Sequence, residues 1–243
     1  MRKFFIFFAL LICANAKAQV SLYGNFSFAK PIYGAARNTD YRALNLPFAC
    51  GALYQIPNKK WAFGAEFGLF GLGSFRQNIG FANATTASDA IFWRISARYD
   101  LLKNSKKLIP YLNMSAGMAY FQTQINVENP MNTEEDLFVQ DVFEDKSYMI
   151  NNSIGVRWHL LDLAEGFHYS FWLDFQLSHT YISAISYINP LAQTGSTYTG
   201  TGALKEVIIT NPQTNISQNI VVGRQYTSSW QYLATSLGVV FQF

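Results

Sequence analysis

The chain has 243 residues, and its 18 lysines and arginines exceed its 15 acidic residues by three. Only 14% of the residues are charged and 16% are aromatic, whereas soluble domains usually carry about 25% charged residues. An ordinary soluble enzyme is therefore a poor match for this composition. Three basic residues lie within the first 18 residues, so the rest of the chain carries 15 of each sign. A neutral chain offers no basic surface for nucleic acid, and no such partner is expected.

Residues 1–18 have the pattern of a secretory signal peptide. Two basic residues precede the apolar run Phe4–Ala14, which is too short to cross a bilayer as a helix, and small residues follow it. We expect cleavage after Ala18, with cleavage after Ala16 as the alternative. The exported part, residues 19–243, is expected to form one barrel domain.

The two cysteines argue against a lipid anchor and against an internal disulfide in the exported chain. A lipoprotein signal would need a small residue just before Cys13, where Ile12 stands. Cleavage removes Cys13 and leaves only Cys50, so no internal disulfide is possible.

Strict alternation of apolar and polar residues recurs along the exported chain, and the segment Ile91–Leu101 is the clearest example. Its apolar residues Ile91, Trp93 and Ile95 share one face, while Arg94 and Arg98 lie on the other, as in a β-strand. Eight such strands are predicted, at Leu22–Phe28, Leu46–Tyr54, Trp61–Gly71, Ile91–Leu101, Leu112–Tyr120, Tyr148–Leu160, Tyr169–Tyr181 and Leu233–Phe243.

The predicted connections alternate between short and long. Short turns are expected at Pro57–Lys60, Lys103–Lys107 and Leu161–His168, and long polar loops at 30–45, 73–90, 122–147 and 183–229. This alternation is typical of outer-membrane barrels, with turns in the periplasm and loops outside. The fold class predicted is therefore all-β, an eight-stranded antiparallel transmembrane up-and-down β-barrel with both termini in the periplasm.

The last long loop contains two further apolar segments, Val207–Thr210 and Ile216–Val222, on either side of Pro212. We expect a short hairpin that stands above the membrane. The alternative is a fifth transmembrane hairpin and ten strands, but Val207–Thr210 is too short to span hydrocarbon.

The faces of the strands decide between a membrane barrel and a soluble, lipocalin-like barrel. The polar faces consist largely of small residues, which suit the crowded lumen of an eight-stranded barrel, so we expect the apolar faces to point outward to lipid. Two outward aromatic belts are then predicted. On the side of the short turns they comprise Tyr54, Trp61, Tyr99, Trp158, Tyr169 and Phe243, and on the other side Phe28, Trp93, Tyr120, Tyr148 and Tyr181.

The end of the chain resembles the sorting signal that closes outer-membrane barrels, because apolar residues alternate up to a final aromatic ring, at Leu237, Val239, Phe241 and Phe243. With the leader and the eight strands, the chain resembles small barrels of the OmpA/OmpX type, and its aromatic-rich style resembles the PorT-like barrels of Bacteroidota. The resemblance implies insertion by the barrel-assembly machinery into a Gram-negative outer membrane, with its lipids and lipopolysaccharide as neighbours. It implies no single activity, since this fold hosts many.

Charged residues on the lumen side of the strands are the main candidate site, namely Glu66, Arg94, Arg98, Asp100, Arg157 and Asp174, with His159 near them. A buried charge is costly unless it is paired, so we expect Glu66 and Asp174 to pair with the arginines. The expected result is a salt-bridge network that closes the lumen, and the alternative is a gated pore.

A second candidate is the pair His168 and Ser170, which share one strand face. The pair resembles the His/Ser pair of lipid A deacylase barrels, in which the histidine activates the serine for acyl transfer and an acid, here Asp174 or Glu165, orients it. The pattern departs from that family because Phe171 stands where an asparagine is expected, and because the pair would face the periplasm. The three histidines show no metal spacing, so neither a metal nor a cofactor is expected.

The long loops are the expected place of function. Acidic residues dominate 122–147, including Glu128, Glu134, Glu135, Asp136, Asp141, Glu144 and Asp145, yet their spacing matches no calcium motif, and a solvated acidic loop is expected. We predict a non-enzymatic, cell-surface outer-membrane barrel that binds a protein partner through 122–147 and 183–229, or that serves surface integrity or secretion. The alternatives are a lipid A-modifying acyl hydrolase and a narrow, porin-like solute channel.

Overall fold

The computed structural model describes residues 20–34, 45–79, 82–102, 105, 107–128, 136–162, 169–190, 202–210, 215 and 217–243. The predicted leader therefore lies outside the described residues. Within them no helix is long and apolar enough to cross a bilayer. The described elements are strands: β1 Val20–Gly34, β2 Asn45–Gln55, β3 Trp61–Asn78, β4 Asn83–Asp100, β5 Leu108–Glu128, β6 Asp136–Asp162, β7 Ser170–Asn189, β8 Ala203–Thr210 and β9 Ser217–Gln242.

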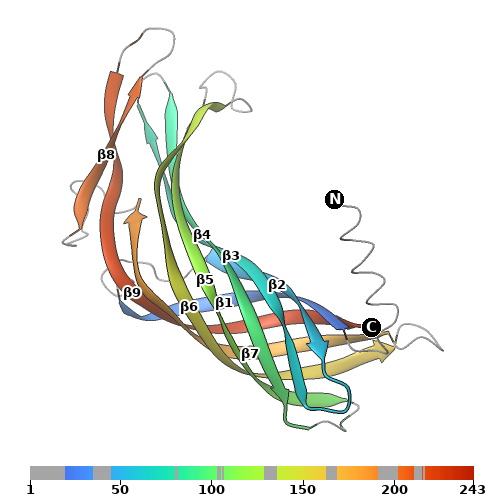
Figure 1. Cartoon of the computed structure of the whole chain (residues 1–243). Coiled ribbons are helices and arrows are strands. Elements are labelled where there is room, and N and C mark those ends of the chain that lie inside the picture. Colours follow the sequence, from blue (N-terminus) through green and yellow to red (C-terminus); the bar gives the residue numbers. More distant parts are fainter. Residues whose placement is uncertain are drawn as a thin grey trace, which may run out of the picture.

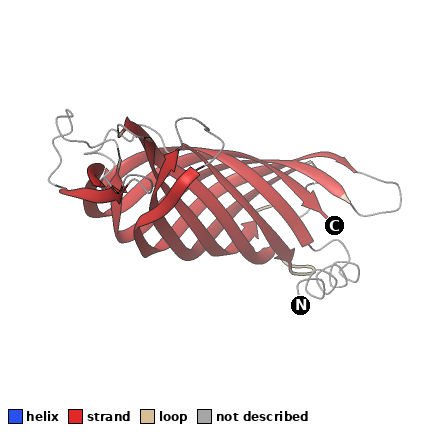
Figure 2. Ribbon diagram, turned by 90° about the horizontal axis from the view of Figure 1, so that it is seen from above, coloured by secondary structure: helices blue, strands red, loops and turns tan. Residues whose placement is uncertain are grey.

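Eight of these strands close into a ring (Figures 1 and 2). Each of β1 to β7 pairs antiparallel with the next, β7 pairs with β9, and β9 returns to β1. A row of paired residues that leaves β1 at Lys30 comes back to β1 at Val20, an offset of ten residues around the ring. For eight strands this offset corresponds to a tilt of about 40°. The predicted eight-stranded antiparallel up-and-down barrel is confirmed.

The ninth strand, β8, forms the hairpin expected in the last long connection. It pairs with β9 from Ala203↔Gln225 to Thr210↔Ser217, and among the described strands it pairs with no other. The barrel is therefore not extended to ten strands within the described residues.

The prediction of long polar loops is wrong for most of their length. The segments expected at 73–90, 122–147 and 183–229 largely continue the strands, so that β6 has 27 residues and β9 has 26, whereas a membrane-spanning strand needs only about 9–11. The tip between β5 and β6, the segment 191–201 and most of 211–216 lie outside the described residues. Figure 1 shows the upper parts of β3 to β6 and of β8 and β9 extending beyond the ring.

Where the strands leave the ring, their outward residues change from apolar to polar and their inward residues change from polar to apolar. Strand β5 illustrates this change. In its first half Leu112 and Met114 point outward while Ser115 is buried inside. Beyond Tyr120 the apolar Ile125 and Val127 are completely buried, and the alternating glutamines and asparagine are partly exposed. The alternation itself never stops, so the backbone remains a strand.

Above the ring the strands divide into two facing sheets, which we call the two-sheet extension. One sheet is the upper part of β3 to β6, and the other is the upper part of β7 and β9 with β8. Among the hydrogen bonds that connect the sheets are those from Gln77 Nε2 to the Val221 carbonyl (3.1 Å) and from Ser88 Oγ to the Ile188 carbonyl (3.0 Å). The core between them is apolar: Ile79, Ala82, Ala84, Ile125, Val127, Ile188, Ile209, Ile220 and Val222.

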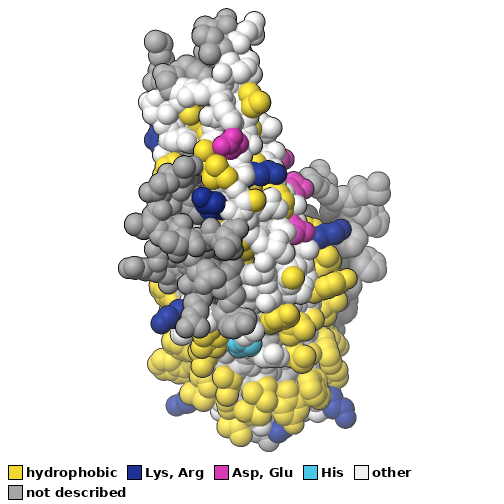
Figure 3. Space-filling view, turned by 90° about the vertical axis from the view of Figure 1, so that its left-hand side faces the viewer, with side chains coloured by type: hydrophobic (Ala, Val, Ile, Leu, Met, Phe, Trp, Pro, Cys, Tyr) yellow, Lys and Arg dark blue, Asp and Glu magenta, His cyan; other side chains and the backbone are white. Residues whose placement is uncertain are grey.

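The outer surface of the ring is an apolar belt (Figure 3). Phe28 and Tyr148 keep 73% of their surface exposed, and nearly all the large exposed apolar side chains belong to this level. The ten residues from Val20 to Lys30, at about 3.3 Å each and tilted by about 40°, give the belt a height of about 25 Å. A soluble barrel would bury this surface and expose the face that is polar here, so this arrangement is that of a barrel turned outward to lipid.

Candidate functional site

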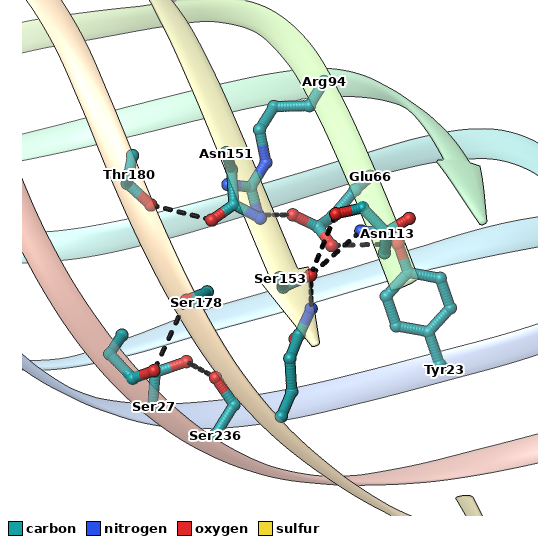
Figure 4. Close-up of polar contacts among 12 residues, drawn as sticks. Tyr23, Ser27, Glu66, Arg94, Asn113, Asn151, Ser153, Ser178, Thr180 and Ser236 are labelled. Atoms are coloured by element: carbon teal, nitrogen blue, oxygen red, sulfur yellow. Dashed lines mark hydrogen bonds and ion pairs between the residues drawn. The ribbon is translucent and has the colours of Figure 1, made fainter. Parts of the chain in front are cut away.

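The lumen contains a polar network that begins with Glu66 (Figure 4). Glu66 of β3 forms an ion pair with Arg94 of β4, its direct neighbour in the strand register. The hydroxyl of Tyr23 on β1 donates a hydrogen bond to the other carboxylate oxygen, at 2.9 Å. Both charged side chains are less than 10% exposed, so the carboxylate has the paired surroundings that a buried charge requires.

Asp100 on β4 joins two arginines at a lower level of the lumen. Its Oδ1 lies 3.2 Å from Arg98 Nε, and its Oδ2 lies 3.0 Å from Arg157 Nη2 of β6. Each arginine also lies near an aromatic ring, since the guanidinium carbon is 5.6 Å from the Tyr111 centroid for Arg98 and from the Trp172 centroid for Arg157. Two cations thus share one carboxylate, with aromatic faces as further support.

Asp174 on β7 is held by a tyrosine where an arginine was expected. The hydroxyl of Tyr111 lies 2.8 and 3.0 Å from its two carboxylate oxygens, and among the described residues Asp174 has no ion pair. Its register neighbour Arg157 pairs with Asp100 instead. The structure therefore brings five of the six predicted lumen charges into ion pairs and places the sixth beside them.

The two tyrosines of this network were missed in the sequence, although a signal for them is present. Tyr111 lies opposite Gly155 in the register, and Tyr23 lies opposite Gly51. A Cβ atom at Gly155 would stand 2.4 Å from the Tyr111 ring, so only glycine lets the ring lie flat across the neighbouring strand. A glycine paired with an aromatic residue across two strands marks an inward ring.

The lumen is also closed above the charges by an aromatic cluster, which comprises Phe70, Phe92, Phe121, Tyr187, Trp230 and Tyr232. Trp230 is central, because its ring centroid lies 5.5 Å from that of Phe121 and 4.8 Å from that of Tyr187. Below the cluster, a cavity beside Glu66, Arg98 and Asp174 measures about 20 Å³, which is room for one water molecule. Two layers, one aromatic and one ionic, therefore fill the described part of the lumen.

Tyr187 gives a test of this packing above the belt. Its hydroxyl is buried without a hydrogen-bond partner among the described residues, and burial, reinforced by the nearby Tyr226, raises its pKa. We expect Tyr187→Phe to leave the free energy of unfolding unchanged or to raise it by about 1 kcal/mol, because no hydrogen bond is lost.

The free energy of unfolding of the wild type and of Tyr187→Phe should also depend differently on pH. A raised pKa means that the contribution of the neutral phenol is complete below its ordinary pKa of about 10 and declines as the pH rises above that value. The free energy of unfolding of the wild type, measured by urea titration in lipid vesicles, should therefore fall between about pH 10 and pH 11, and by more than that of Tyr187→Phe. An equal fall in both would contradict this assignment.

The predicted His/Ser pair lies only partly within the described residues, because His168 is outside them. Ser170 Oγ accepts a hydrogen bond from Trp172 Nε1 at 2.8 Å. His159 lies at the same end of the barrel, with its Nε2 3.0 Å from Asp162 Oδ1. Among the described residues no group of three or more His, Cys, Asp or Glu is arranged to hold a metal ion.

Several of the described acidic residues of 122–147 have structural partners, among them Asp141 and Asp145. Asp141 accepts hydrogen bonds from the amides of Gln124 and Gln122, both at 2.8 Å, and these donors lower the pKa of Asp141. Asp145 accepts a hydrogen bond from the backbone of Ser186 at 2.7 Å and thereby joins β6 to β7. Glu134 and Glu135 lie outside the described residues.

The C-terminal residues close the ring. Leu237 and Val239 point outward and are 50% and 45% exposed, as their place in a lipid-facing strand requires. The rings of Phe241 and Phe243 lie 4.8 Å apart, and the backbone of Phe243 donates to the carbonyl of Val20 at 2.9 Å. The segment thus forms the seam between the first and last strands.

Comparison with known proteins finds distant similarity to solved structures alone. No protein-family model matches the chain, and no curated protein sequence is similar to it. Similar solved structures include Neisserial surface protein A, with 13% identity over 94% of this chain and 98% of that one and a TM-score of 0.45. A major outer-membrane protein of Thermus thermophilus has 10% identity over 94% and 100%, with a TM-score of 0.45. The attachment invasion locus protein Ail of Yersinia pestis has 11% identity over 93% and 97%, with a TM-score of 0.42.

Proposed function

We propose that the protein is an integral, non-enzymatic outer-membrane β-barrel that presents its two-sheet extension to a partner at the cell surface. The observation that carries the proposal is the combination of an apolar belt about 25 Å high with a lumen that is filled at two levels. A belt of that height matches bilayer hydrocarbon, and a filled lumen leaves the exposed extension as the part that meets other molecules.

The membrane part of the proposal is tested by the behaviour of the mature chain. We expect it to require detergent for solubility and to migrate on gels as a compact species that becomes slower after boiling. Both results follow from a closed hydrogen-bonded ring with an apolar exterior. A monomer that stays soluble in plain buffer would instead indicate a secreted carrier.

The partner-binding part rests on two apolar side chains that are exposed above the belt. On β8, Ile208 is 69% exposed and Leu204 is 37% exposed, although the surrounding outer faces of the extension are polar. Leu204 and Ile208 lie on the same face of β8, and we infer that a partner contacts them there.

The test is cross-linking in intact outer membranes followed by purification of the barrel. A cross-linked partner should appear with the wild type and with the control Ala203→Lys, and disappear with Ile208→Lys/Leu204→Lys, since all three residues are exposed on one strand. Equal recovery of the partner from all three proteins would refute binding at this strand.

The alternative function, a narrow solute channel, makes a different prediction. Because the ionic and aromatic layers both cross the lumen, we expect planar-bilayer recordings of the wild type to show no stable conductance. A large, steady conductance would favour the channel and contradict a closed lumen.

A further inference from the structure

Among the described residues, the apolar belt contains polar side chains where β6 and β7 pair. Asn152 on β6 and His179 on β7 are direct neighbours in the register, and both lie on the outward face of the ring. His179 Nε2 lies 3.3 Å from Gln231 Oε1 of β9, whereas the Asn152 side chain has no hydrogen-bond partner among the described residues. In hydrocarbon an amide without a partner is costly, so these groups indicate a ligand that satisfies them.

The polar residues lie along a groove in the same face. The groove has a volume of about 630 Å³, and apart from Asn152 and His179 its outward lining is apolar, with Leu112, Met114, Ile154, Leu177 and Leu233 around it. Ala97 is the small residue in its floor. The groove crosses β4, β5, β6, β7 and β9 on the lipid-facing side, and its apolar lining matches an acyl chain.

A cation marks the upper end of the same row of residues. Lys30 pairs with Leu233, which pairs with His179, which pairs with Asn152. With a strand tilt of about 40°, each step in this row descends by about 3 Å, so His179 lies about 6 Å and Asn152 about 9 Å below Lys30. Lys30 is exposed at the margin of the belt, where lipid head groups begin.

We propose that this groove is a binding site for one anionic lipid of the outer leaflet, whose acyl chain carries an amide linkage and a hydroxyl group close to the head. The inference rests on the proposed outer-membrane location. Lys30 faces the head-group phosphate, His179 and Asn152 hydrogen-bond to the amide and hydroxyl just below it, and the chain descends past Met114 and Ala97.

The test is a titration of the refolded full chain in detergent, with bound lipids counted by native mass spectrometry. The probes are lipid A, which carries phosphates and amide-linked hydroxyacyl chains, and phosphatidylglycerol of matched chain length, which carries neither amide nor hydroxyl on its chains. We expect the wild type to retain one lipid A and to prefer it by about tenfold or more, the effect of one or two hydrogen bonds at membrane depth.

Three variants separate recognition from simple lipid contact. Asn152→Leu/His179→Leu should lose the preference, and it should still fold because both changes make an outward position apolar. Ala97→Phe should fill the groove and abolish lipid A retention. Ala52→Phe is the matched control, because Ala52 is also an outward alanine, on β2, at nearly the same depth but away from the groove.

Several outcomes would overturn the site. These are equal binding of both lipids to the wild type, an unchanged preference in the double variant, equal effects of Ala97→Phe and Ala52→Phe, or a dimer of the chain in place of the lipid. If these proteins still show heat-modifiable migration, only the lipid site fails and the outer-membrane barrel stands.

Discussion

Replacement of Asp100 by asparagine is expected to lower the free energy of unfolding by about 3–5 kcal/mol, the range for removing one partner from a buried ion pair. Asp100 is the only carboxylate within ion-pair distance of both Arg98 and Arg157 among the described residues, and all three side chains are less than 10% exposed. Without its charge, two buried guanidinium groups lie side by side uncompensated. Urea unfolding of the barrel in lipid vesicles, followed by tryptophan fluorescence, measures the loss.

The matched control for Asp100→Asn is Glu128→Gln in the extension. Glu128 pairs with Arg76, whose side chain is 56% exposed, so this pair is largely solvated. Its loss should change the free energy of unfolding by no more than about 1 kcal/mol. If both variants lose equally little, the lumen charges are solvated as well, and the channel becomes the better account of the lumen.

Replacement of Trp230 by alanine is expected to cost about 3–5 kcal/mol, the range for truncating a large buried aromatic side chain. Trp230 is 1% exposed and contacts both Phe121 and Tyr187, so its removal leaves a cavity in the centre of the aromatic cluster. Planar-bilayer conductance should nevertheless stay low, because the ionic layer below still fills the lumen. The same urea titration and conductance recordings check both expectations.

An outward tryptophan provides the comparison for Trp230→Ala. Trp93 is 43% exposed on the apolar belt, and its replacement by alanine removes contact with lipid without opening an internal cavity. Its loss of stability should therefore be clearly smaller. A conductance that appears in Trp230→Ala alone would show that the aromatic cluster is the sole barrier, contrary to the two-layer arrangement.

The ring was predictable from the sequence because one physical rule applies to it throughout. In Ile91–Leu101 and its counterparts, bulky apolar residues alternate with small or charged ones, and that period fixes both the strand and the direction of each face. The two-sheet extension was predicted as loops because its outward residues, such as Gln122 and Gln124, are polar like those of an ordinary loop. Its inward partners Ile125 and Val127 form the opposite pattern, which a search for outward apolar faces does not detect.

The lumen charges could be identified as inward residues, but their partners could not all be assigned. Arg94 and Glu66 are direct register neighbours, so pairing and proximity coincide. Asp100 reaches Arg157 across the lumen from a strand that is not its neighbour, a contact that depends on the curvature of the closed ring. The role of Tyr111 in replacing an arginine beside Asp174 depends likewise on the space above Gly155.

The exchange of the two faces halfway along the strands has a consequence for how the molecule reaches its final state. The described upper parts of β3–β4 and β5–β6 have largely polar outer surfaces, and insertion of the proposed membrane barrel would carry these surfaces through the hydrocarbon to the far side. Once there, a return would again bring hydrated amides and carboxylates into contact with lipid tails. The two-sheet extension would then fix the depth of the barrel in the bilayer and make its insertion effectively irreversible.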